Sequence, residues 1–88
     1  MTTFLGLVPD EVETLAVDFD AKAGDIETLI SSLVVRLSTT TWTGPDRDQF
    51  QSDWDGPLTS NLRNAAASLR DAAAVARANA EQQRQASA

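Results

Sequence analysis

The stretch TTTWTGPDRDQF, residues 39–50, divides the chain into two long helical patterns. Three consecutive threonines are poor helix formers, so they predict the end of the first helix. Pro45 suits the first turn of a second helix, where its missing N–H is no loss, and Thr43 is placed to cap that helix. A bare turn needs no tryptophan, so Trp42 requires an explanation of its own.

Upstream, residues 9–37 carry apolar side chains at alternating spacings of four and three, which is a heptad seam. Asp10 and Glu13 match a capping box, so we expect the first helix to cover about residues 10–40. The seam residues are Val12, Ala16, Phe19, Ala23, Ile26, Ile30, Leu33 and Leu37.

Downstream, a second seam predicts a helix over about residues 45–84, after a turn at 41–45. Pro57 falls inside this helix and removes a hydrogen bond to the Asp53 carbonyl, so we expect a kink near Pro57. The seam residues are Phe50, Trp54, Leu58, Leu62, Ala66, Leu69, Ala73, Ala76 and Ala80.

A short connection makes the two helices antiparallel neighbours in one all-α hairpin domain. Two helices enclose little interior, and the first seam is wider than one partner helix can cover, so we expect the hairpin to dimerise into a four-helix bundle. The first helix would supply large side chains and the second alanines. The expected dimer interface consists of Leu15, Phe19, Ile26, Leu29, Ile30, Leu33, Val34, Phe50, Trp54 and Leu62.

Charges predict how the two helices align. Acids at seven-residue spacing flank the first seam, and arginines at the same spacing flank the second. Folding about the turn would pair Glu27 with Arg63 and Asp20 with Arg70, and would continue the series one heptad further. Exposed ion pairs contribute only roughly 0–1 kcal/mol each, so these pairs mark the register and add little stability.

Composition narrows the function classes. The 88 residues include no histidine, cysteine or tyrosine, and the net charge is −6. Acid–base catalysis would fall to carboxylates at helix-surface spacing, so an enzyme is not expected, and neither is a cofactor. The acids Asp18/Asp20 and Asp53/Asp55 lack a calcium-binding loop, so no metal is expected. The charge argues against binding nucleic acid, and no stretch suits membrane insertion or a cleaved signal peptide.

The sequence TWTGP at residues 41–45, followed by FQSDW at 50–54, between two long helices, resembles the Trp-x-Gly (WXG) family. Members are small early-secreted-antigen-like substrates of type VII (ESX-like) secretion systems. The resemblance covers nearly the whole chain, and Trp42 and Gly44 carry the motif. It implies a helical hairpin, homo- or heterodimers built as four-helix bundles, and export from the cytoplasm without a cleaved signal peptide.

The resemblance also implies a composite export signal, in which the Trp-x-Gly turn acts with a Tyr-x-x-x-Asp/Glu motif near the C-terminus of a partner chain. This chain departs from that pattern because it has no tyrosine. Arg77 stands four residues before the candidate acid Glu81. Either this pair is a variant signal, or a separate partner supplies the tyrosine.

The sequence therefore predicts a non-enzymatic secreted hairpin protein, a substrate, effector or structural partner of a type VII system. Expected partners are a second copy, favoured over a second small Trp-x-Gly protein, and a secretion ATPase during export. The alternative is a cytoplasmic adaptor or chaperone-like hairpin that binds a larger helical protein. Structurally, Trp42 is expected to cover the open end of the bundle.

Overall fold

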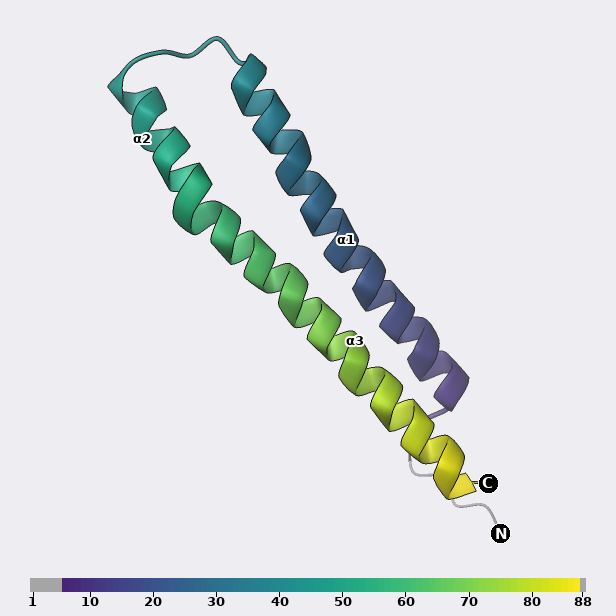
Figure 1. Ribbon diagram of the computed structural model, residues 1–88. Coiled ribbons are helices and arrows are strands. Elements are labelled where there is room, and N and C mark those ends of the chain that lie inside the picture. Colours follow the sequence, from purple (N-terminus) through teal and green to yellow (C-terminus); the bar gives the residue numbers. More distant parts are fainter. Residues whose placement is uncertain (1–5, 88) are drawn as a thin grey trace.

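Two long helical arms form an antiparallel hairpin in the computed structural model, which describes residues 6–87 (Figure 1). The first arm is α1 (Pro9–Thr39), and the second runs through α2 (Pro45–Asp53), the π-helix η1 (Trp54–Leu58) and α3 (Thr59–Ser87). Residues 6–87 contain no strand, so the predicted all-α hairpin is confirmed. The N-terminal stretch weighed as a signal peptide lies partly outside these residues. No helix within them is long and apolar enough to span a membrane.

The start of α1 differs from the prediction. Pro9 occupies the first turn and Val8 is the N-cap residue, without a side-chain hydrogen bond to the helix. The expected capping box is therefore wrong, because Asp10 already lies inside the helix. Its backbone carbonyl accepts a hydrogen bond from the Thr14 hydroxyl, at 3.0 Å.

The end of α1 follows from its hydroxyl side chains. Ser38, Thr39 and Thr40 each donate a hydrogen bond to the carbonyl of Val35 or Arg36. In a continuing helix, these carbonyls would accept hydrogen bonds from backbone N–H groups further along the chain. Here the side-chain hydroxyls donate to them instead. The hydroxyl cluster thus stops the helix at Thr39.

Small residues form the seam between α1 and α3. Ala16 and Ala23 of α1, and Ala66, Ala73 and Ala80 of α3, are at most 1% exposed. Of the large side chains expected from α1, Ile30 alone is buried among the described residues, at 5% exposure. Alanines on both helices allow the backbones to approach closely, and the other large apolar side chains of α1 flank the seam.

The second arm is interrupted where the sequence places Gly56 and Pro57. A proline ring inside an α-helix clashes with the carbonyl four residues earlier. Here the backbone widens into one π turn, and the Thr59 backbone N–H bonds the Trp54 carbonyl five residues before it. The Thr59 hydroxyl donates to the same carbonyl. The irregularity thus places Trp54, only 8% exposed, against the hairpin interior.

Candidate interaction surfaces

The Trp-x-Gly turn depends on the backbone of Gly44. Gly44, and not the expected Thr43, is the N-cap residue of α2, with φ 113° and ψ −179°. This conformation is essentially restricted to glycine, because a Cβ atom would strain the backbone. The Gly44 carbonyl accepts the first helical hydrogen bond, from Asp48 N at 3.1 Å. The connection of residues 40–44 therefore ends in a backbone conformation that requires glycine, and this explains the glycine of the motif.

Trp42 packs against α2 from this connection. Its ring lies 5.4 Å from the ring of Phe50 at an interplanar angle of 48°, a tilted arrangement that aromatic pairs favour. Both rings remain open to solvent, Trp42 at 39% and Phe50 at 41% exposure. Trp42 thus covers the turn end of the hairpin only in part.

An apolar groove of about 280 Å³ opens beside this aromatic pair. We call it the turn groove. Trp54 lies against its inner side, and its indole Nε1 is buried without a hydrogen-bond partner in the described part of the chain. The lining residues are Leu33, Arg36, Leu37, Thr40, Trp42, Phe50 and Trp54.

The residues expected in a dimer interface divide into three groups. Ile30 and Trp54 are 5% and 8% exposed, so most of each side chain packs inside the hairpin itself. Phe19, Ile26 and Leu62 are half-buried beside the alanine seam. The exposed group, 39–48% accessible, consists of Leu15, Leu29, Leu33, Val34 and Phe50.

Most of these residues on α1 form one continuous stripe. With 3.6 residues per turn, the spacings 4, 7, 3 and 4 keep the side chains on one side of the helix. Val34 follows Leu33 directly, so it lies about 100° around the helix and outside the stripe. We call the following residues the apolar stripe: Leu15, Phe19, Ile26, Leu29 and Leu33.

The other side of the α1–α3 seam is polar. Arg70 pairs with Glu27, and Arg77 Nη2 lies 2.7 Å from Asp20 Oδ2. The predicted register is therefore wrong by one heptad: Arg70 was expected beside Asp20. The pairs Arg70–Glu27 and Arg77–Asp20 both have their midpoint between residues 48 and 49, inside α2, and not in the turn. Because α2 does not pack against α1, the two arms do not pair outward from the turn itself.

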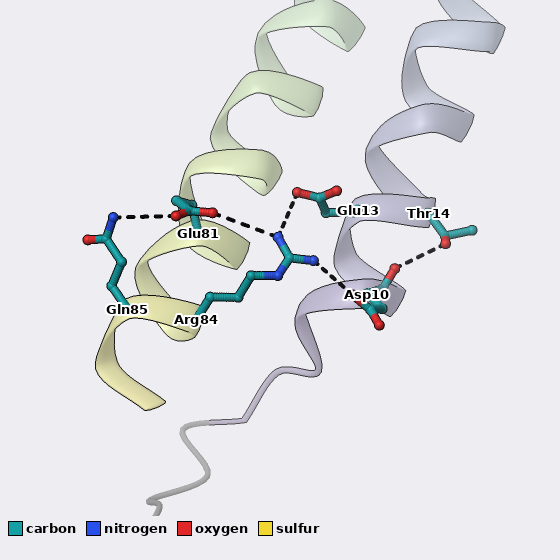
Figure 2. Close-up of polar contacts among 6 residues, drawn as sticks. All are labelled: Asp10, Glu13, Thr14, Glu81, Arg84 and Gln85. Carbon is teal, nitrogen blue, oxygen red and sulfur yellow. Dashed lines mark hydrogen bonds and ion pairs between the residues drawn. The ribbon is translucent and has the colours of Figure 1, made fainter. Parts of the chain in front are cut away.

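Arg84 closes this polar edge at the open end of the hairpin (Figure 2). Its guanidinium donates to Glu13 Oε1 and Asp10 Oδ1, both at 2.8 Å, and lies 3.9 Å from Glu81 Oε2. The hydrogen bonds to Glu13 and then to Asp10 raise the pKa of Arg84 above its ordinary value. The shifted series leaves Arg63, the arginine of this row that lies nearest the turn, without an ion pair within residues 6–87.

The residues of the candidate C-terminal signal point to different partners. Arg77 pairs with Asp20 of α1, whereas Glu81 lies near Arg84 and accepts a hydrogen bond from Gln85 Nε2 at 3.4 Å. Arg77 therefore contributes to holding the hairpin together, and Glu81 is the more exposed member of the pair.

The described residues contain no group of three or more potential metal ligands. Comparisons with protein-family models, with curated proteins and with solved structures find no match to this chain.

Sequence reasoning missed the turn groove and its members Arg36, Leu37 and Thr40. One signal was present: Pro57 inside the second helix predicts a local change in the helix, and Trp54 precedes it by three residues. That change decides which side chains of the second arm face α1 at the turn end.

Proposed function

We propose that this protein is a non-enzymatic helical hairpin that acts by binding a second hairpin, and that the favoured partner is a second copy. The apolar stripe supports the proposal. Leu15, Leu29 and Leu33 stay 39–48% exposed on one side of α1, whereas the ion pairs occupy the other side of the seam. Covering such a stripe with an equivalent stripe yields a four-helix bundle.

The charges favour a second copy that runs antiparallel. The acids Glu11 and Asp18 lie in the N-terminal half of α1, and Arg36 lies near its C-terminus. None of the three has an ion pair within the described chain. Asp18 and Arg36 are separated by 18 residues, or five turns, so they share one side of the helix. A two-fold axis across α1 brings the Arg36 end of each copy to the acidic end of the other.

Light scattering tests self-association. We expect the purified protein to have twice the 9.4 kDa chain mass at micromolar concentration. Leu29→Glu places a charge in the stripe and should give the monomer. Val35→Glu is the matched control, because Val35 is 62% exposed and lies off the stripe, so this variant should remain dimeric. A folded monomer from the unmodified chain would refute self-association.

A second hairpin protein is the alternative partner. If the chain is monomeric or poorly helical alone and becomes folded with a second small hairpin protein, the partner is that protein and not a second copy. A dimer of the unmodified chain that Leu29→Glu does not weaken would place the interface elsewhere.

We further propose that the protein is a substrate, effector or structural partner of a type VII secretion system, exported from the cytoplasm without a cleaved signal peptide and engaging a secretion ATPase in transit. Support comes from the resemblance of Trp42-Thr43-Gly44 to the family motif, together with its place in the turn of a helical hairpin. Arg77 and Glu81 are the candidate variant of the C-terminal signal.

Export can be measured as the fraction of protein in the culture medium of a bacterium with an active type VII system. We expect export of the unmodified chain and its loss in a strain without the secretion ATPase. Glu81→Gln removes the candidate acid and so tests the variant signal. Gln82→Glu is the control, because it changes the neighbouring residue and leaves Glu81 in place. Retention of all variants inside intact cells would instead support the cytoplasmic adaptor.

A further inference from the structure

The two arms of the hairpin separate at the turn end. α3 packs along α1, but no Cα atom of α2 comes within 8 Å of α1 (Figure 1). The turn groove lies in this region, between the last turns of α1 and the aromatic residues of the second arm. The apolar side chains of the groove are therefore not covered by a closely packed second helix, as the side chains beside the alanine seam are.

The turn groove has an apolar lining that the described chain does not cover. Trp42, Phe50 and Leu33 are each 39–41% exposed around it. Arg36 is the only charged lining residue, and it has no ion pair within residues 6–87. The groove thus suits an apolar segment that carries an acidic residue nearby.

Such a segment exists at the opposite end of the molecule. Leu7 and Val8 precede α1, and Val8 is 44% exposed. Leu7 lies in a groove whose other lining residues are mostly amides, namely Asn79, Gln82, Gln83 and Ala86. Glu11 follows Val8 by three residues, is exposed and has no ion pair in the described chain. This segment therefore combines the apolar side chains and the nearby acidic residue that suit the turn groove.

The segment cannot reach the groove of its own chain. Between Val8 and Thr40 lie the 31 residues of α1, which span about 46 Å at 1.5 Å per residue. The hairpin as a whole is 70 Å long. Only a second molecule can bring these two ends together.

We propose that the turn groove of one copy receives Leu7 and Val8 of a second copy, with Glu11 beside Arg36 at its rim. The inference rests on the antiparallel dimer of the proposed function. A two-fold axis across α1 places the N-terminal end of each copy at the turn end of the other, so the contact forms twice. Burial of exposed aromatic surface and two interchain ion pairs then fix the orientation of the dimer.

Disulfide cross-linking tests this contact, because the chain contains no native cysteine. Single-cysteine variants Val8→Cys and Thr40→Cys are mixed, dissociated in denaturant, refolded and oxidised. A disulfide requires Cα atoms within about 7 Å, so a bond between these positions can form only between chains. The mixed covalent dimer should be the main product, and each variant alone should give little. Thr28→Cys, on α1 and 12 residues before Thr40, is the control and should not link to Val8→Cys.

The outcomes separate this inference from the proposed function. A dimer by light scattering that cross-links Val8→Cys to itself, or Thr40→Cys to itself, overturns the groove contact and leaves self-association standing. A monomer by light scattering overturns both. A charge test gives a second readout: Arg36→Glu should weaken the dimer, and Glu11→Arg in the same chain should restore it. Failure of that rescue argues against the proposed contact.

Discussion

Gly44→Ala should destabilise the protein by about 1–3 kcal/mol, through backbone strain alone. Gly44 has φ 113° and ψ −179°, a region that L-residues with a Cβ atom rarely occupy. A Cβ atom built on Gly44 meets no other atom within 4 Å, so neither a clash nor a cavity contributes. The expected loss is therefore the conformational energy of the turn.

Gly24→Ala is the matched control. Gly24 lies inside α1, and its added Cβ would also meet nothing within 4 Å. Here alanine should stabilise the helix by about 0.5–1 kcal/mol. The same substitution thus has opposite signs at two uncrowded positions, and the two variants should differ by about 1.5–4 kcal/mol.

Urea unfolding followed by circular dichroism measures both variants at one protein concentration, because dimerisation would add to the apparent stability. In a domain of this size, each 1 kcal/mol shifts Tm by about 4–8 °C, so thermal unfolding resolves the difference as well. Equal stability of Gly44→Ala and the unmodified protein would show that the turn relaxes into another conformation. The strain argument for the motif glycine would then be refuted.

Two further perturbations test the interior and the register. Trp54→Ala should cost about 3–5 kcal/mol because Trp54 is only 8% exposed, and Trp42→Ala should cost less because Trp42 is 39% exposed; equal losses in Tm would contradict the burial pattern. Glu27→Arg should weaken the hairpin at low salt, and Arg70→Glu should restore about 0.2–1 kcal/mol, more than Arg63→Glu, because Arg63 lines the same pocket as Glu27 but makes no ion pair with it. A double-mutant cycle measures this coupling, and a stronger rescue by Arg63→Glu than by Arg70→Glu would restore the register expected from the sequence.

The hairpin could be predicted from the sequence because its signals are local and repeated. Seams of three- and four-residue spacing run through both arms, and a threonine cluster followed by Gly44-Pro45 separates them. Each signal acts through the backbone of its own segment. The positions of the helices therefore follow from local signals, whereas the stability of the helices depends on what they pack against.

The capping residues were wrong because several residue types compete for one position. Asp10 and Thr43 both favour an N-cap, but Pro9 directly precedes Asp10, Pro45 follows Thr43 by two residues, and each proline takes the first helical position. The residue before that proline then becomes the N-cap, which is Val8 in α1 and Gly44 in α2. Proline at the first helical position outweighs the capping preference of the polar side chain.

The contacts between the arms were harder to predict because they depend on three-dimensional directions. Spacing identifies a row of acids and a row of arginines, but not the point about which the two rows fold onto each other. Because α2 does not pack against α1, the pairing is centred inside α2, and Arg70 meets Glu27 and not Asp20. Likewise, the π turn at Pro57 rotates the segment around Trp54 in a way that a 3.6-residue period does not describe. The turn groove follows from that rotation.

The same alanine seam that brings the arms together also limits what they can bury alone. The fully buried residues are alanines, and no large side chain among residues 6–87 is fully buried. Buried apolar area is the main favourable term in folding, so a hairpin joined by methyl groups gains little from its own interior. The larger apolar surface lies in the stripe and the turn groove. If a second copy covers them, much of the stabilisation of the folded chain is intermolecular, and folding and association form one equilibrium. The backbone strain that Gly44→Ala introduces would then lower the stability of the dimer as well as that of the turn.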